Sequence, residues 1–291
     1  MTAMTETIIQ EHPCFSLDRP NNKGRIHLPV SPGCNIECKF CDRKINTTEQ
    51  RPGVTAQVIS PQEALEVVRK SLDLSPEITV IGIAGPGEAL ATPYALETFH
   101  LIGKEFPGLI KCMSTNGLLL EDLADEIINA GVNTLTVTVN EIYPNKQAQI
   151  CGRIRYKGEV YEGTEAARLL ISRQIAGIRR IRAAGIMIKV NTVLVPGIND
   201  THIADIAQAV HEAGADLYNI IPLIPQHEMS DNTPPSCFQI DKARTEAEKY
   251  IRVFRHCQHC RADAVGVPGG KDYGERIYLD RVSHSATFSH G

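Results

Sequence analysis

Short runs of apolar and β-branched residues alternate with helical patterns along most of this chain. Six runs are expected to form strands: Arg25–Val30, Ile78–Ala84, Ile110–Ser114, Thr134–Val139, Met187–Val195 and Leu217–Leu223. Helices are expected between and after them, at Ser60–Leu72, Pro93–Phe106, Leu120–Ala130, Glu165–Ala184 and Thr201–Ala213. Such alternation predicts parallel strands that are buried on both faces. Six units of this kind predict an α/β fold, an incomplete (βα)6 relative of the eight-stranded TIM barrel.

Local signals support several of these element ends. Ser60-Pro-Gln-Glu63 is typical of a capping box with proline at the first helical position. Asp200 is the expected N-cap of the helix that follows it. A further helix is expected at Lys242–Phe254 and a mobile loop at Pro144–Gly163. Three glycines follow helical runs, where a left-handed residue is favourable: Gly131, Gly185 and Gly214.

The composition bounds the class of protein. With 291 residues and 42% apolar content, the chain can form one barrel with extensions. Its net charge of −4 gives no basic field for nucleic acid or an anionic membrane. It has neither an apolar leader nor a run of about eighteen apolar residues. Nine cysteines in short clusters fit a reducing compartment better than a disulfide framework. We therefore expect a cytoplasmic monomer without nucleic-acid or membrane partners.

The chain is expected to comprise four segments. Residues 1–24 form an N-terminal extension, 25–240 the partial barrel, 241–280 a C-terminal helix with a cysteine-containing extension, and 281–291 a disordered tail. Parallel α/β folds carry their chemistry at the C-terminal ends of the strands. The polar and glycine-rich motifs fall at those ends: Cys34–Cys41, Gly85–Glu88, Ser114–Gly117, Asn140 and Pro196–Asn199.

Cys34, Cys38 and Cys41 form a C-x3-C-x2-C triplet. Three thiolates this close can hold three irons of a 4Fe–4S cluster and leave the fourth iron open to a small molecule. A structural zinc ion instead takes four protein ligands. The triplet resembles the signature of the radical S-adenosylmethionine (SAM) enzymes. In that superfamily SAM binds the open iron and is cleaved by one electron to a 5′-deoxyadenosyl radical. The resemblance implies a 4Fe–4S cluster and SAM as cofactors.

Gly85-Pro86-Gly87-Glu88 follows an expected strand and resembles the motif that binds the SAM amino group in this superfamily. Its glycines permit close backbone approach, and Glu88 can accept a hydrogen bond from an ammonium group. Taken alone, such a turn is as often structural. Further residues resemble superfamily positions near the SAM carboxylate, ribose and adenine: Ser114, Asn116, Asn140 and Asn191.

The outlying cysteines bear on the reaction. Cys257-Gln-His-Cys260 fits half of a zinc site that His256 or His259 completes, and it equally fits ligands of another iron–sulfur cluster. Cys14 precedes the first expected strand, and Cys112 lies within the third. Two more cysteines have no assigned role and are expected to be inert thiols: Cys151 and Cys237.

Several segments together resemble the NifB family, the radical SAM proteins of nitrogenase cofactor assembly, from His12 to Gly266. They are His12-Pro-Cys14, the triplet with Asp42-Arg-Lys44, Glu49–Gly53, Ala84–Glu88, Ser114–Gly117, Thr136–Asn140 and Cys257–Gly266. The resemblance implies a partial barrel of the radical SAM type whose two extensions carry further cluster ligands. Because the chain ends soon after Cys260, it resembles the short, stand-alone form without a NifX-like domain.

The resemblance also implies a reaction and its residues. NifB proteins fuse two 4Fe–4S clusters around a carbon from SAM, with an added sulfur, into an 8Fe–9S–C precursor. Glu49 and Arg51 are then candidates for proton handling or transient ligation, the alternative being a surface ion pair. For His27 the alternative is a hydrogen-bonded core histidine. The implied ligands of the two substrate clusters are His27 with Cys112, Cys257 with Cys260, and Cys14 on either cluster.

Implied partners are an iron–sulfur cluster donor, an electron donor, and an acceptor or carrier of the product. Two other functions remain open on the sequence alone. One is a radical SAM enzyme with a single auxiliary cluster that modifies a peptide or small molecule. It would hold about eight irons, against about twelve for the cluster-fusing enzyme. The other is a non-enzymatic iron–sulfur carrier or zinc-binding scaffold, which leaves Gly85–Glu88 without a task.

Overall fold

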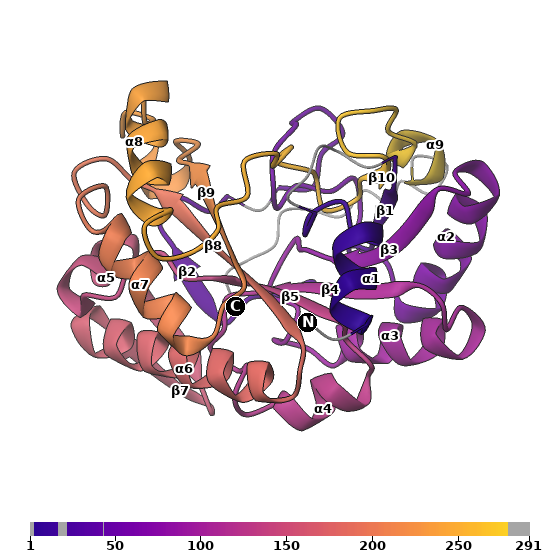
Figure 1. Ribbon diagram of the computed structural model, residues 1–291, viewed down its shortest axis with the longest axis horizontal. Coiled ribbons are helices and arrows are strands. Elements are labelled where there is room, and N and C mark those ends of the chain that lie inside the picture. Colours follow the sequence, from indigo (N-terminus) through magenta and orange to yellow (C-terminus); the bar gives the residue numbers. More distant parts are fainter. Residues whose placement is uncertain (1–2, 17–21, 43, 279–291) are drawn as a thin grey trace.

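A seven-stranded sheet forms the centre of the computed structural model (Figure 1), which describes residues 3–16, 22–42 and 44–278. In spatial order its strands are β10 (Val265–Gly266), β1 (Gly24–His27), β3 (Ile78–Ile83), β4 (Ile110–Thr115), β5 (Thr134–Thr138), β8 (Met187–Leu194) and β9 (Leu217–Pro222). Six strands are parallel, and β10 runs antiparallel to β1. The partial α/β barrel is therefore confirmed, and each expected strand coincides with an observed one.

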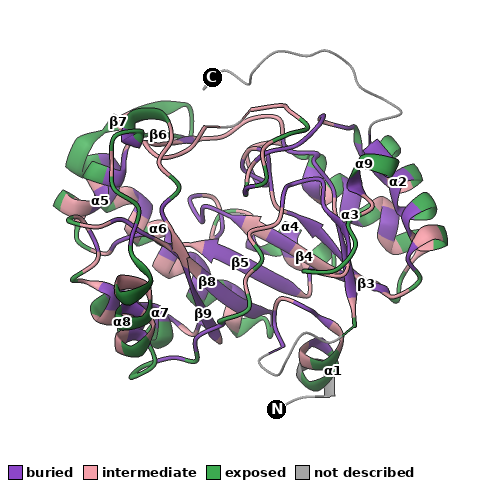
Figure 2. Ribbon diagram, turned by 90° about the horizontal axis from the view of Figure 1, so that it is seen from above, coloured by how far each residue is buried: buried purple, intermediate pink, exposed green. Residues whose placement is uncertain are grey.

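The helices that follow the parallel strands lie on the outer side of the curved sheet (Figure 1). They are α2 (Pro61–Leu74), α3 (Tyr94–Glu105), α4 (Ala124–Asn129), α6 (Gly163–Ala183) and α7 (Ile203–Ala213). Seen from above, the buried strands occupy the centre, and the exposed residues lie toward the outside, on the outer helices, on β7 and in loops (Figure 2). The main apolar core fills the layer between sheet and helices, with Phe99 and Ile102 of α3 fully buried. Because the helices cover the outer face of the sheet, the inner face is available for a functional site.

Helix ends follow the expected signals in part. The Ser60 side chain accepts from the Glu63 backbone N–H, and the Glu63 carboxylate accepts from the Ser60 N–H, which confirms the capping box of α2. Gly214 ends α7 with a φ of 106°, and Gly131 and Gly185 also have positive φ. The prediction that Asp200 is the N-cap of α7 is wrong, because His202 occupies that position. The Asp200 side chain instead accepts a hydrogen bond from the Gly197 N–H.

The prediction of a mobile loop at residues 144–163 is wrong. They form α5 (Pro144–Ile150), β6 (Cys151–Tyr156) and β7 (Glu159–Glu162), and a second sheet orders its strands β2-β6-β7. Its β2 (Ile36–Cys38) belongs to the cysteine triplet. The buried residues of β6 are Cys151, Ile154 and Tyr156. Exposed polar residues separate them, so the sequence showed no apolar run that would predict a strand. The strands β6 and β7, which are distant in the sequence, therefore pair with the segment that carries the triplet.

Two expected helices differ in extent. The C-terminal helix α8 spans Cys237–Ala247, so it begins and ends earlier than Lys242–Phe254. Val253 instead bridges to Tyr218 of β9, which sends the chain back along the sheet toward Cys257. The helix expected at Leu120–Ala130 is shorter, since only Ala124–Asn129 (α4) is helical.

The remaining elements are α1 (Ala3–Glu11), the 3-10 turn His227–Met229 and α9 (Gly274–Tyr278). The tail expected at 281–291 lies outside the described residues. In the described part of the chain, no helix has both the length and the apolar character needed to cross a membrane.

Candidate active site

The cysteine triplet docks on the turn that follows β3. Gly87 N donates to Ser31 O at 2.8 Å, and Glu88 N donates to Gly33 O at 2.7 Å. A Cβ on Gly87 would lie 2.0 Å from Gly33 O, so only glycine permits this approach. The loop that carries the cysteines and the glycine turn are thus held together through their backbones.

A first cavity of about 180 Å³ opens beside the triplet. Seven of the eight residues expected to bind SAM line it, and Asn191 does not. Together with the triplet, the lining residues are Cys34, Cys38, Cys41, Gly85, Pro86, Gly87, Glu88, Ser114, Asn116 and Asn140. None of the three cysteines forms a disulfide bond, and all three are half-buried. This donor set fits a cluster with three thiolate ligands and an open iron next to a polar cofactor pocket.

Glu88 also has a local role that was not expected. Its carboxylate accepts from Thr115 Oγ1 at 2.5 Å, from Asn116 N at 2.6 Å and from Leu90 N at 3.1 Å. Only 4% of Glu88 is exposed. The carboxylate therefore ties the end of β4 to the glycine turn, and its expected contact with the SAM ammonium stays a prediction.

Cys151 is a neighbour of the triplet that sequence reasoning missed. It is fully buried, pairs with Cys38 across β2 and β6, and shares a side-chain hydrogen bond with it. Cys151 Sγ also donates to Arg153 O at 3.7 Å. Because a metal-bound cysteine is a thiolate, iron on Cys38 would offer the Cys151 S–H a second acceptor. The contact between Cys151 and Cys38 could not be predicted, because residues 144–163 were expected to form a loop and not a strand.

A second cavity of about 340 Å³ adjoins the first. Phe40, Cys41, Ala84, Ser114 and Thr138 line both cavities. All five residues implied as ligands of substrate clusters line the second one: Cys14, His27, Cys112, Cys257 and Cys260. Arg51 and Asn191 line it as well. Residues from both chain ends and from all six parallel strands of the sheet therefore meet in one space next to the triplet.

His27 is held in the form that a metal requires. Its Nδ1 lies 2.8 Å from Arg261 O, so Nδ1–H donates to this carbonyl and Nε2 keeps a free lone pair. Burial, followed by the charge of Arg25, lowers the pKa of His27 to about 4. The imidazole is therefore neutral near pH 7. Both features suit iron ligation as well as a core histidine.

The pH dependence of folding stability in the metal-free chain should show that the His27 imidazole is buried in its neutral form. The pKa of His27 is about 4 in the folded chain and about 6.5 when unfolded. Its contribution to stability is complete above pH 6.5 and is lost as the pH falls toward 4, about 3 kcal/mol in all. Denaturant unfolding of the wild type and His27→Gln at pH 7 and pH 4 measures it. The variant should lose less stability, and an equal loss in both proteins would contradict the assignment.

Gly82 provides the space for the His27 ring. A Cβ at this position would lie 2.8 Å from His27 Cδ2 and 3.3 Å from Nε2. We expect Gly82→Ala to displace the imidazole and weaken iron binding in the second cavity by roughly ten- to a hundredfold. Chelator competition followed by iron analysis measures the change. Gly108→Ala is the control, because its Cβ would meet no atom within 4 Å. Equal iron affinity in both variants would refute this role.

Glu49 and Arg51 form an ion pair, with Arg51 Nε 2.6 Å from Glu49 Oε2. Arg51 Nη1 also donates to Asp42 O at 2.7 Å, and only 8% of Arg51 is exposed. Arg51 lines the second cavity, whereas Glu49 does not. The pair is therefore placed at the edge of the cavity, and its role in proton handling stays a prediction.

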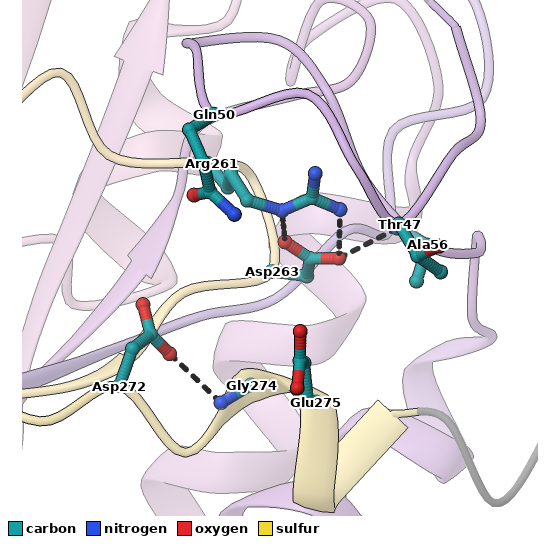
Figure 3. Close-up of a pocket in the computed structure, with 8 residues that line it drawn as sticks. All are labelled: Thr47, Gln50, Ala56, Arg261, Asp263, Asp272, Gly274 and Glu275. Carbon is teal, nitrogen blue, oxygen red and sulfur yellow. Dashed lines mark hydrogen bonds and ion pairs between the residues drawn. The ribbon is translucent and has the colours of Figure 1, made fainter.

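An unexpected ion pair fixes the loop that carries Glu49 (Figure 3). Arg261 donates to Asp263 through Nε at 2.8 Å and through Nη2 at 2.9 Å. Arg261 Nη2 also donates to Asn46 O, and Asp263 accepts from Ala56 N at 2.6 Å. These contacts tie loop 46–56 to the segment directly after Cys260. No local sequence signal marks them, since Arg261 and Asn46 are 215 residues apart.

Lys189 of β8 is a buried cation that sequence reasoning also missed. It is 6% exposed, and Nζ donates to Cys14 O at 3.0 Å. The same Nζ lies 5.0 Å and 4.9 Å from the ring centroids of Phe15 and Phe254. It thereby joins the two chain ends to the sheet. Burial nevertheless raises the pKa of Cys14 to about 11, so this thiol loses its proton only when metal binds.

Within the described residues, no three His, Cys, Asp or Glu side chains form a site for a single metal ion.

Comparisons with known proteins agree with this geometry. Residues 28–210 match the family model of the radical SAM superfamily. The "FeMo cofactor biosynthesis protein NifB" of Methanocaldococcus infernus is 44% identical over 94% of this chain and 91% of its own length. The protein of the same name from Methanocaldococcus jannaschii is 45% identical over 94% and 92%.

Solved structures support the fold alone. Streptococcus suis SuiB matches with a TM-score of 0.58 at 12% identity, over 91% of this chain and 54% of that one. A radical SAM methyltransferase from Sphaerobacter thermophilus also gives 0.58, at 19% identity over 79% and 65%. The family match and the archaeal relatives together show that this chain belongs to the radical SAM superfamily and, within it, to the NifB family.

Proposed function

We propose that this chain makes the iron–sulfur precursor of the nitrogenase cofactor. In this reaction two 4Fe–4S substrate clusters are fused around a carbon from SAM, with an added sulfur, into an 8Fe–9S–C product. One observation carries the proposal: a cavity lined by five candidate cluster ligands shares a wall with the cavity of the cysteine triplet. A radical formed beside the triplet would thus face iron–sulfur substrates.

The first cavity would hold the resident cofactors. When bound, the triplet's 4Fe–4S cluster and SAM supply a methyl group and, on one-electron reduction, a 5′-deoxyadenosyl radical. Cys34, Cys38 and Cys41 would ligate three irons. The glycine turn at 85–87 allows the cofactor to approach the backbone, and Glu88 would orient its ammonium group. Ser114, Asn116 and Asn140 would contact its carboxylate, ribose and adenine, and Asn191 would reach it from the adjoining second cavity, which it lines.

The second cavity would hold the substrates. His27 and Cys112 would bind one cluster, Cys257 and Cys260 the other, while Cys14 can serve either. Five ligands for two clusters leave several irons without a protein ligand. Sparse ligation suits the reaction, because the product has to leave the enzyme. Glu49 and Arg51, which form an ion pair at the cavity edge, would handle protons or bind an iron transiently.

The segments divide this work. The barrel at 25–240 would carry the SAM site, while the extensions at 1–24 and 241–280 would supply Cys14 and the Cys257–Cys260 pair. The partners are a cluster donor, an electron donor, and an acceptor or carrier of the product. None of the nine cysteines forms a disulfide bond, which supports a cytoplasmic location.

Product analysis tests the proposal. The anaerobic, iron-reconstituted protein is incubated with SAM and dithionite. Methionine, 5′-deoxyadenosine and S-adenosylhomocysteine should all form, because SAM serves as radical source and as methyl donor. About twelve irons per chain are expected before the reaction. Formation of 5′-deoxyadenosine without S-adenosylhomocysteine would contradict methyl transfer and favour an enzyme for a peptide or small molecule.

A further inference from the structure

Three residues that line the second cavity each have a buried hydrogen-bond donor without an acceptor among the described residues: His12 at Nε2, Arg25 at Nε and Arg51 at Nη2. The donors of His12 and Arg25 lie next to candidate cluster ligands. The first belongs to His12, which is 2% exposed. Its Nδ1 accepts from the Cys14 backbone N–H at 3.1 Å, so the single proton of the neutral ring lies on Nε2. Nε2 is buried and has no partner in the described part of the chain. Buried donors in folded proteins almost always have partners.

The second donor belongs to Arg25 of β1, which is 4% exposed and also lines the cavity. Nη1 donates to Gly266 O at 2.6 Å and Nη2 to Cys260 Sγ at 3.1 Å. Nε is buried and, among the described residues, has no partner. No carboxylate of the described residues forms an ion pair with this guanidinium. A buried charge without a counter-ion is costly, so this site is suited to an anionic ligand.

The surroundings identify the missing acceptor as sulfur. Arg25 already donates to one thiol, and the cavity is lined by Cys14, Cys112 and Cys260. Lys189 adds a second buried positive charge to the same cavity. We propose that His12 Nε2 and Arg25 Nε donate hydrogen bonds to sulfur atoms of a substrate iron–sulfur cluster. The two residues would thereby favour an anionic cluster over a neutral ligand.

This inference rests on the proposed function, since it assumes iron–sulfur clusters in the second cavity. Its consequence is electronic. Hydrogen bonds to cluster sulfur stabilise the reduced, more negative state and therefore raise the reduction potential. A bond from charged Arg25 is roughly twice as strong as one from a neutral ring, so its effect is the larger.

Two variants separate these bonds from structural roles. In His12→Asn, Oδ1 can still accept from the Cys14 N–H, but no donor remains at the position of Nε2. In Arg25→Gln the amide can still donate to a backbone carbonyl, but the charge is lost. Arg25→Lys keeps the charge without the planar fork. Matched controls outside both cavities are His100→Asn on α3 and Arg180→Gln on α6.

The measurement is an EPR-monitored redox titration of the reconstituted, full-length protein. SAM is added to a parallel sample to identify the signal of the triplet's cluster. Relative to wild type, the midpoint potential of a substrate cluster should fall in His12→Asn and further in Arg25→Gln. Arg25→Lys should restore part of the fall, and both controls should match wild type.

Two results would overturn the proposal. One is an unchanged potential in both His12→Asn and Arg25→Gln with full iron content. The other is cluster loss in Arg25→Lys equal to that in Arg25→Gln, which would assign Arg25 only to the contact with Gly266. Neither result bears on product formation from SAM by the wild type. Failure of this inference therefore stays distinct from failure of the proposed function.

Discussion

Replacing Cys34, Cys38 and Cys41 together by alanine is expected to abolish 5′-deoxyadenosine formation. The three thiols lie at the first cavity, and no other cysteine lines that cavity. Iron should fall from about twelve to about eight per chain, because only one of three clusters loses its ligands. Anaerobic reconstitution, iron analysis and chromatography of the SAM products measure both effects.

Cys237→Ala is the control for this experiment. Cys237 is exposed at the start of α8, so its loss should change neither iron nor SAM cleavage. If the triple variant still formed 5′-deoxyadenosine at the wild-type rate, the triplet would not be the site of SAM cleavage.

Replacing Cys257 and Cys260 by alanine should separate SAM cleavage from product formation. Both thiols line the second cavity but not the first. The double variant should lose about four irons per chain, while the triplet's cluster remains. SAM should still be cleaved reductively, but the cluster product should be absent. Iron analysis and assay of the extracted product measure these two outcomes.

Gel filtration and circular dichroism of the metal-free double variant control for folding. Cys260 accepts a hydrogen bond from buried Arg25, so its replacement leaves one more donor unpaired. A folded variant that retains all of its iron would refute Cys257 and Cys260 as ligands. A folded variant that loses all iron would show that the two cavities are not independent sites.

The barrel could be predicted because its signals are local. Each parallel strand is a short apolar run, and each following helix has its own period and end signals. The sheet β2-β6-β7 could not be predicted, because β6 pairs with β2 of the triplet loop, which is far away in the sequence. The buried face of β6 is interrupted by exposed residues, so its composition resembled that of a loop.

The site divides in the same way. The triplet and the glycine turn are recognisable because their residues are adjacent in sequence. The positions of His12, Lys189 and Arg261 were not predictable. Each acts through contacts with distant segments: Lys189 with Cys14 O, and Arg261 with Asn46 O. For His12 only the adjacent Cys14 contact is local, and it gives no indication of the unpaired Nε2.

The fate of the SAM methyl carbon tests the account most directly. The reconstituted protein is incubated with SAM that carries a radiolabelled methyl group, and the iron–sulfur product is extracted anaerobically. The account predicts that the label accompanies iron in the extracted product and is not released as methanethiol when acid decomposes the product. Label that remains in SAM-derived small molecules or in a peptide, with none in the iron–sulfur fraction, would contradict it.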